Sequence, residues 1–178
     1  MTDKLLAADI VELLGRGGLA IPEHAEDSES SLSLAPASYS ALRDPQGAEQ
    51  LGRELAASLQ GFEPTAVLIW QVPYDVVLGF VVARELEVQA IRSYDLEGLV
   101  GFDGKFDDEG RLVVVGDIFR EAEPVRAMHS LAEQHHHQVV AAGSLLAVEG
   151  PGTEELERLG VPLVSLIDLE AVRGGSSI

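Results

Sequence analysis

The chain has 178 residues, 46% of them hydrophobic, which suits one compact domain with a buried core and argues against disorder. Thirty acidic residues against twelve basic ones give a formal net charge of −18, and this acidic field disfavours nucleic acid and anionic membrane surfaces as partners. Cysteine is absent, which excludes disulfides, thiolate metal sites and a cysteine nucleophile. The opening residues lack a basic region followed by an unbroken apolar run, and no stretch reaches the ~20 apolar residues that a membrane span needs. We therefore expect a cytoplasmic protein.

Two amphipathic helices are predicted in the first third of the chain. Residues 4–14 carry apolar side chains at helical spacing, and a run of glycines then ends the helix. Asp44 predicts an N-cap and Pro45 a first helical position, and three leucines line one face of the helix that follows, up to Gly61. Between the two helices, residues 21–40 are polar with scattered apolar positions, which indicates irregular structure or short edge strands.

Short apolar runs alternate with helical or loop segments beyond residue 61. This alternation predicts an α/β fold with a mostly parallel sheet covered on both faces by helices. The predicted strands cover residues 66–70, 88–91, 112–115, 139–148 and 163–166. The predicted helices between them cover residues 76–86, 124–134 and 153–159. Ligands of such open sheets bind beyond the carboxyl ends of the strands, so the loops of interest are 71–75, 92–110 and 116–124.

The segment RLVVVGDIFREAEPVR at residues 111–126 and the order of the elements around it resemble the type I phosphoribosyltransferases, orotate phosphoribosyltransferase most of all. Further matching segments are LGREL at 51–55, ARELEV at 83–88 and RLGVPLVSLIDL at 158–169. The resemblance implies one domain over residues 1–178, with N-terminal helices and a small hood region at 1–61 and a five-stranded, mostly parallel core sheet at 62–170. It also implies a homodimer in which loops of one subunit lie near the other subunit's site.

The phosphate loop of this family departs from its usual pattern here. In the family, a hydrophobic strand leads through two acidic residues into a loop of Thr and Gly, whose backbone N–H groups and hydroxyls hold a 5-phosphate. In this chain Gly116 stands in the first acidic position and Asp117 in the second, and Pro124 removes a backbone donor. Each of the two glutamates in the loop, at ~6 Å and an effective dielectric constant of ~20, opposes a unit of phosphate charge by roughly 3 kcal/mol. The candidate ligand-binding residues of this degenerate loop are Asp117, Ile118, Phe119, Arg120, Glu121, Ala122, Glu123 and Pro124.

The pyrophosphate loop of the family, which is normally small and rich in glycine, also differs. Its equivalents in this chain are Gln71, Val72, Pro73, Tyr74 and Asp75. Bulky, proline-bearing and acidic residues obstruct a pyrophosphate where bare backbone is needed. Trp70 and Tyr74 are interpreted either as packed side chains or as the walls of a more apolar pocket.

The long substrate-covering loop of orotate enzymes corresponds to residues 92–110. Arg92 matches the arginine that follows the strand in the family, but the rest is acidic apart from Lys105. We therefore expect no cationic clamp for a transition state and instead a solvated hairpin with turns at its glycines. These glycines are Gly101, Gly104 and Gly110. Upstream, residues 38–40 resemble in position a substrate-side segment of the family.

The sequence QHHHQ at residues 134–138, with His129 nearby, suggests a possible metal site because imidazole is a common metal ligand. Adjacent residues of a helix point about 100° apart, which favours helix capping or solvation over convergence on one ion. No metal ligand is assigned, and a histidine-based metal-binding module is kept as an alternative.

We interpret the sequence as an orotate phosphoribosyltransferase-like protein that is non-catalytic or catalytically altered and binds an unidentified small molecule or partner. No catalytic residue and no cofactor are assigned. The alternative is an active phosphoribosyltransferase of nucleotide metabolism with a divergent site, in which Arg92, Arg120 and Arg126 replace the backbone donors and magnesium is required.

Overall fold

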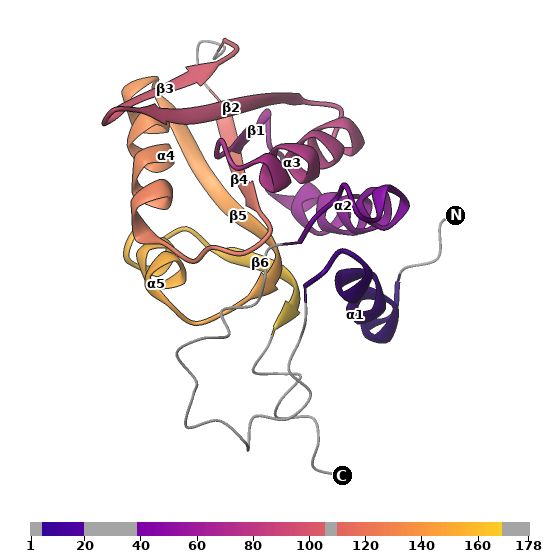
Figure 1. Ribbon diagram of the computed structural model, residues 1–178. Coiled ribbons are helices and arrows are strands. Elements are labelled where there is room, and N and C mark those ends of the chain that lie inside the picture. The colour runs from indigo at the N-terminus through magenta and orange to yellow at the C-terminus, as the bar shows by residue number, and fades with distance from the viewer. Residues whose placement is uncertain (1–4, 20–38, 106–109, 169–178) are drawn as a thin grey trace, which may run out of the picture.

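The computed structural model describes residues 5–19, 39–105 and 110–168, which form an α/β fold around one six-stranded sheet (Figure 1). The strands are β1 (Ala66–Ile69), β2 (Gln89–Leu96), β3 (Leu99–Asp103), β4 (Gly110–Gly116), β5 (His137–Ala147) and β6 (Leu163–Asp168). The helices are α1 (Ala7–Arg16), α2 (Pro45–Leu59), α3 (Pro73–Glu85), α4 (Ala122–Gln134) and α5 (Pro151–Arg158), with a short 3₁₀ turn at Gln60–Phe62.

The strands lie in the order β3-β2-β1-β4-β5-β6. All neighbouring pairs are parallel except β2 and β3, which form an antiparallel hairpin. The predicted fold class, an α/β fold with a mostly parallel sheet between helices, is confirmed.

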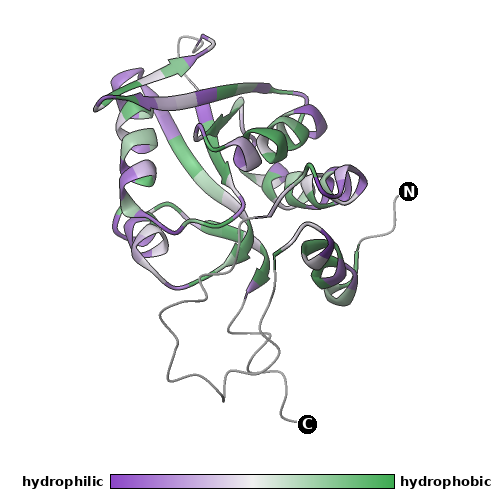
Figure 2. Ribbon diagram, in the orientation of Figure 1, coloured by the Kyte–Doolittle hydropathy of each residue, from purple (hydrophilic) through white to green (hydrophobic). Residues whose placement is uncertain are grey.

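Helices cover both faces of this sheet. On one face, α1, α2 and α3 pack against Val67, Ile69, Val113 and Val115. On the other face, α4 and α5 pack against Leu68, Leu112 and Val114. This alternation along β1 and β4 is the two-residue period of a strand whose two faces are both buried. Figure 2 shows the central strands largely green, and it shows green and purple bands along α4, as expected for a helix with one buried side.

The Asp44–Pro45 start of α2 is confirmed. Asp44 Oδ1 accepts a hydrogen bond from the Gly47 amide over 3.1 Å, and Pro45 is the first helical residue. The Arg16 guanidinium at the end of α1 lies 2.8 Å from Asp44 Oδ2. The cap of α2 therefore also joins α2 to α1.

The sheet has six strands rather than the predicted five, because the chain after Ile91 forms the β2–β3 hairpin. β2 continues past Ile91 to Leu96, so Arg92 lies inside the strand rather than after it. The chain turns at Glu97 and Gly98, whose φ angles are 54° and 85°, and Asp95 Oδ1 accepts from the Gly98 amide over 2.8 Å.

The hairpin predicted between Arg92 and Gly110 is formed by β2 and β3, but two of its glycines are not at turns. Gly110 is not, because it is the first residue of β4, and neither is Gly101. It lies within β3, opposite Tyr94 of β2. A Cβ atom at Gly101 would come within 2.8 Å of the Tyr94 ring, so glycine is needed here for close approach.

Two sequence predictions fall partly outside the described residues: the irregular segment at 21–40 and the loop at 94–110. Within the described ranges, no helix is long and apolar enough to cross a membrane.

Candidate functional site

The sheet has a topological switch point between β1 and β4. The chain leaves β1 for β2 on one side and returns to β4 on the other, so the connections after β1 and β4 diverge at their carboxyl ends. A cavity of about 170 Å³ lies at this point. Its lining residues are Trp70, Val72, Asp75, Val115, Asp117, Ile118, Phe119, Arg120, Glu121, Pro124, Val125 and Met128.

The two loops that the sequence identified as degenerate meet in this cavity. From the loop after β1, Val72 and Asp75 line it, whereas Gln71, Pro73 and Tyr74 do not. From the loop after β4, Asp117 to Glu121 and Pro124 line it, whereas Ala122 and Glu123 do not.

Pro73 is the first residue of α3, where its fixed φ suits the helix start. The helix therefore begins three residues before the predicted start at Val76. This earlier start places Asp75 in the first turn of α3, beside β4.

Asp117 is buried just after β4 and is 5% exposed. Its Oδ1 accepts from the Ile118 amide over 2.7 Å, and its Oδ2 accepts from the Tyr39 amide over 2.8 Å. Its backbone carbonyl accepts from the amides of Leu145 and Leu146 at the end of β5. Both carboxylate oxygens therefore receive a hydrogen bond from a backbone amide.

Asp75 adjoins Asp117 directly. Its Oδ1 accepts from the Asp117 amide over 2.8 Å, and its side chain is 9% exposed. Burial, and next the negative charge of Asp117, raise the pKa of Asp75 to about 7, although the Asp117 amide and the Arg120 charge act in the opposite direction. We call Asp75 and Asp117 the carboxyl pair. Asp75 therefore keeps its proton to a higher pH than an ordinary aspartate does.

The position of Asp75 also changes the interpretation of Gly116. A Cβ atom at Gly116 would lie 3.6 Å from both carboxylate oxygens of Asp75, so the carboxyl of Asp75 lies beside the place where the first acidic residue of the family pattern would begin. Two carboxyls are therefore present at the end of β4, one from the residue that follows β4 and one from α3. Sequence reasoning missed this because the two residues are 42 positions apart and meet only through strand order.

The remaining walls of the cavity are mainly apolar. Phe119, Val125 and Met128 are buried, and Trp70 is half-buried at its rim. Gly152 allows α5 to approach the Phe119 backbone closely, because a Cβ atom at this position would meet the Phe119 carbonyl oxygen at 2.5 Å.

The three arginines proposed for an active site lie apart from one another. Arg120 lines the cavity. Arg126 points to α5, where its Nε lies 2.9 Å from Oε1 of Glu155, and Arg92 forms an ion pair with Asp103 on the hairpin. Of these three side chains, only Arg120 adjoins the carboxyl pair.

A second cavity, of about 320 Å³, lies between the β2–β3 hairpin and the start of α4. It shares Trp70, Glu121 and Pro124 with the first cavity. Asp95 and Glu123 add two further carboxylates, and none of the described side chains that line it is basic. The space beyond Trp70 is therefore acidic.

The histidine run is spread over separate environments. His135 makes an edge-to-face contact with Phe102 at a ring centroid distance of 4.9 Å, whereas His137 is buried at the start of β5. His136 has a φ of 60°, and His129 pairs with Glu133 over 3.4 Å. In the part of the chain that the structure describes, no three potential ligands are grouped for a metal ion.

No protein-family model and no curated protein matches the sequence. Solved structures do match the fold. Orotate phosphoribosyltransferase from Aeropyrum pernix is 19% identical with a TM-score of 0.69, over 95% of this chain and 97% of that one. The Mycobacterium tuberculosis H37Rv orotate phosphoribosyltransferase, solved with inorganic phosphate, is 16% identical with a TM-score of 0.69, over 94% and 90% of the two chains.

An adenine phosphoribosyltransferase from Thermoanaerobacter pseudethanolicus is 19% identical with a TM-score of 0.59, over 72% of this chain and 84% of that one. Identities this low establish a shared fold rather than a shared activity. The chain has the type I phosphoribosyltransferase fold.

Proposed function

We propose that this chain is a phosphoribosyltransferase-like binding protein that holds a phosphate-free ligand at the switch point and does not transfer phosphoribosyl groups. The ligand combines hydroxyl or amino donors with a flat or apolar portion, as nucleosides do. The observation that carries this proposal is the carboxyl pair of Asp75 and Asp117, buried where the loops after β1 and β4 meet.

The electrostatics of the cavity oppose a phosphorylated ligand. Asp117 and Glu121 bring negative charge to its lining, and Arg120 is the one basic side chain among the described lining residues. Because Asp117 is buried, its carboxylate acts on a phosphate more strongly than it would at an open surface. The acidic second cavity beyond Trp70 extends the same field.

The carboxyl groups of the cavity suit a ligand that carries hydrogen-bond donors. Carboxylate oxygens accept from hydroxyl and amino groups, and a protonated Asp75 can also donate to an uncharged acceptor. Trp70, Phe119 and Met128 provide apolar surface for a flat ring. The result is a mostly apolar cavity with a few polar groups fixed by backbone hydrogen bonds, which is the usual form of a small-molecule site.

Trp70 is the chain's single tryptophan and lines both cavities, so its fluorescence reports occupancy directly. Titrations with nucleosides are expected to change this fluorescence at concentrations at least about tenfold lower than titrations with the matching 5′-monophosphates. Asp75→Asn should alter nucleoside affinity, whereas Glu133→Gln on the exposed side of α4 should not. Micromolar binding of phosphoribosyl pyrophosphate with magnesium, accompanied by pyrophosphate release on adding a nucleobase, would overturn the proposal.

The second candidate is an active phosphoribosyltransferase with a divergent site. It is favoured by the two carboxyls at the end of β4 and by Arg120 beside them. Calorimetry with phosphoribosyl pyrophosphate and magnesium separates the two functions. Submicromolar binding that Arg120→Ala abolishes would support transfer, and no heat at millimolar ligand would exclude it.

A further inference from the structure

The second cavity adjoins the first. Trp70, Glu121 and Pro124 line both, so a ligand that is too long for the first cavity extends into the second. The first cavity, at about 170 Å³, is smaller than the roughly 300 to 1,000 Å³ of most small-molecule sites, whereas the second, at about 320 Å³, lies within that range. A ligand of nucleoside size, as proposed for the switch point, therefore occupies both cavities.

Three carboxylates from two separate elements line the second cavity. Asp95 belongs to β2, Glu121 precedes α4, and Glu123 lies in the first turn of α4. The two glutamates suit the positive N-terminal end of α4, but Asp95 belongs to the hairpin and has no such reason to be there. Arg120, the basic residue of the first cavity, does not line the second.

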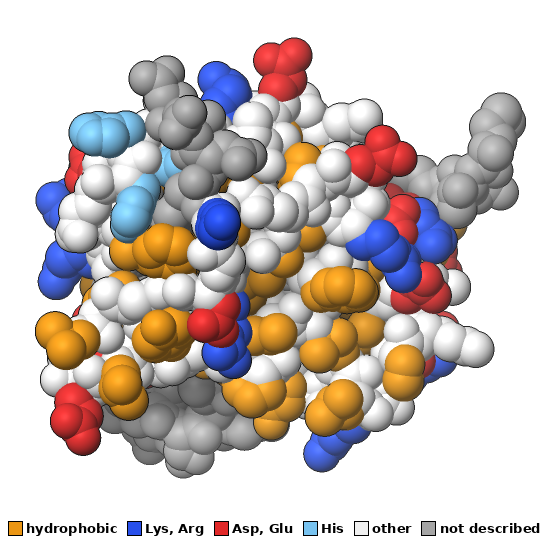
Figure 3. Space-filling model, turned by 90° about the horizontal axis from the view of Figure 1, so that it is seen from above, with side chains coloured by type: hydrophobic (Ala, Val, Ile, Leu, Met, Phe, Trp, Pro, Cys, Tyr) orange, Lys and Arg blue, Asp and Glu red, His pale blue; other side chains and the backbone are white. Residues whose placement is uncertain are grey.

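The negative charge of the second cavity is not balanced within the described part of the protein. On the hairpin Arg92 pairs with Asp103, but none of the three carboxylates forms an ion pair with another described residue. The surrounding surface is not uniformly acidic either. The hairpin lies at the top of Figure 1, and Figure 3, seen from that side, shows hydrophobic side chains across much of the face. The overall acidity of the chain therefore does not by itself account for this cavity.

Trp70 adds an aromatic side chain where the two cavities meet. An indole ring attracts a cation over its face more strongly than the other aromatic side chains do. Carboxylates and an indole together suit an ammonium or guanidinium group, and they disfavour a carboxylate or a phosphate.

We propose that the ligand carries a positively charged amino or guanidino group, which lies in the second cavity beside Trp70 and the three carboxylates. The ring and the hydroxyl groups of the same ligand occupy the first cavity, beside the carboxyl pair. This inference rests on the proposed function, because it assigns the charge of the ligand that the switch point binds.

Titrations with matched nucleosides, followed by the fluorescence of Trp70, test the charge of the ligand. The probes are 5′-amino-5′-deoxyadenosine with adenosine, and adenosine bearing an aminoethyl group on its exocyclic nitrogen with its hydroxyethyl counterpart. They place the charge at opposite ends of the nucleoside, and the members of each pair differ in charge but hardly in shape. At least one amine should bind about tenfold more tightly than its hydroxyl counterpart. Raising the NaCl concentration from about 0.05 M to about 0.5 M should reduce this ratio, because salt screens the attraction.

The double variant Asp95→Asn, Glu123→Gln removes two of the three carboxylates. It should lower the ratio of the two affinities to about twofold or less. Asp95 Oδ1 accepts from the Gly98 amide over 2.8 Å, and asparagine keeps an acceptor for this bond, so the turn is retained. Glu133→Gln is the matched control, because Glu133 lies near the end of α4 and lines neither cavity, and it should leave the ratio unchanged.

The outcomes separate this inference from the proposed function. Equal affinities for the amine and hydroxyl ligands would overturn the inference and leave the proposed function standing. A preference for the amine that persists in the double variant would also overturn it, because the charge would then be bound elsewhere. If none of the probes binds, the proposed function and the inference both fail.

Discussion

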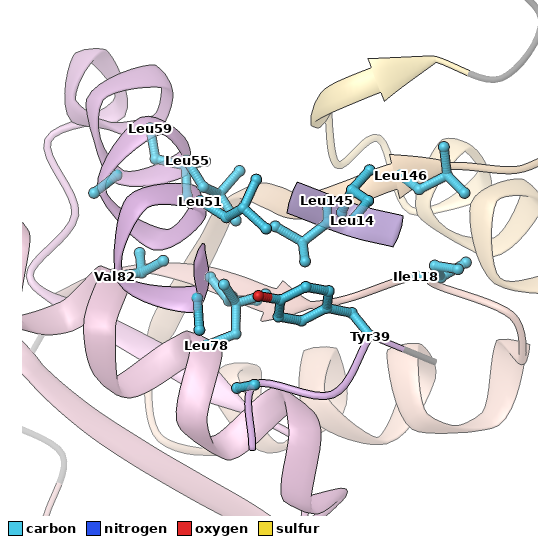
Figure 4. Packing of buried hydrophobic residues seen from close by; sticks show 14 of the residues in the cluster. Leu14, Tyr39, Leu51, Leu55, Leu59, Leu78, Val82, Ile118, Leu145 and Leu146 are labelled. Carbon is cyan, nitrogen blue, oxygen red and sulfur yellow. The ribbon is translucent and has the colours of Figure 1, made fainter. Parts of the chain in front are cut away.

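The backbone amide of Tyr39 donates a hydrogen bond to Asp117 Oδ2 over 2.8 Å, joining two residues that are 78 positions apart in the sequence. The Tyr39 ring lies in the core among leucines of α1, α2 and α3 (Figure 4), and a Cβ atom at Gly17 would overlap it. Burial raises the pKa of Tyr39 to about 12, so the hydroxyl stays neutral at physiological pH. The segment before α2 and the cavity at the end of β4 therefore form one packed unit.

Asp117→Ala should lower the free energy of unfolding by about 2 to 4 kcal/mol. The substitution leaves two buried amides, those of Tyr39 and Ile118, without their charged acceptor. Urea unfolding measures the loss, and faster hydrogen exchange at the Tyr39 amide should accompany it. Asp95→Ala is the matched control, because Asp95 also accepts from a backbone amide but in an exposed turn, where about 1 kcal/mol or less is expected. Equal losses in the two variants would contradict this account of Asp117.

Asp75→Asn should change how stability depends on pH. The folded pKa of Asp75, about 7, lies above its ordinary value of 3.8, so the folded chain holds a proton that the unfolded chain releases between these values. The contribution of Asp75 to stability is therefore greatest below about pH 4 and is lost as the pH rises to about 7, by up to ~1.4 kcal/mol per pH unit.

Asparagine keeps an acceptor for the Asp117 amide but cannot ionise. The variant should therefore match the wild type most closely near pH 4 and exceed it in stability above pH 7. Urea unfolding of both proteins at about pH 5 and pH 8 measures this difference. Parallel pH profiles would show that Asp75 is ionised in the folded chain as readily as in the unfolded one.

Gly152→Ala should destabilise the chain by about 1 to 3 kcal/mol, because the new Cβ atom would meet the Phe119 carbonyl at 2.5 Å and backbone cannot yield easily. The cavity wall at Phe119 would shift, so the fluorescence of Trp70 should change as well. Gly15→Ala in α1 is the control, since nothing lies within 4 Å of its Cβ position and alanine should stabilise that helix by up to ~1 kcal/mol. Similar effects of the two substitutions would contradict the proposed contact.

Glu155→Gln should destabilise the chain at neutral pH and lose this effect in acid. Arg158 and next Arg126 lower the pKa of Glu155 to about 2. The bond from Arg126 joins α4 to α5, whereas the bonds from Arg158 lie within α5. Because the folded pKa lies below the ordinary value of 4.5, this stabilisation is complete above about pH 4.5 and disappears as the pH falls toward 2. Thermal unfolding of the wild type and of Glu155→Gln at about pH 6 and pH 3 should show a smaller difference in stability at the lower pH. A difference that stays constant would exclude the ion pairs of Glu155 as its cause.

The sequence predicted the parts of the fold that depend on local patterns. Asp44 and Pro45 marked the start of α2 because cap and first-turn chemistry is local. β3 was missed because its residues 99–103 adjoin an acidic stretch and the preceding turn places Glu97, rather than asparagine or glycine, at a positive φ. Such a strand is recognised only through its partner β2.

The candidate site was predicted only in part. Asp117 and the loop after β4 were identified through the family resemblance, and residues of this loop and of the loop after β1 line the cavity. The hydrogen bond between Asp75 and the Asp117 amide depends on the adjacency of β1 and β4 and on the early start of α3 at Pro73. No local pattern in the sequence indicates that β1 and β4 are adjacent or that Asp75 lies beside Asp117.

The turn at Glu97–Gly98 also determines how the hairpin can tolerate changes in length. Tyr94 and Asp95 are consecutive, but Tyr94 lies over Gly101 and Asp95, on the opposite side of the hairpin, lines the second cavity. Inserting one residue between Asp95 and the turn would leave β2 in register with β1 but would shift β3 by one position, so the side chains of β3 would exchange faces. Phe102 would then leave the buried cluster beside α4, and the neighbouring Asp103 would point toward that cluster. Insertions of two residues would keep each β3 side chain on its own face, so this hairpin can lengthen or shorten only in even steps.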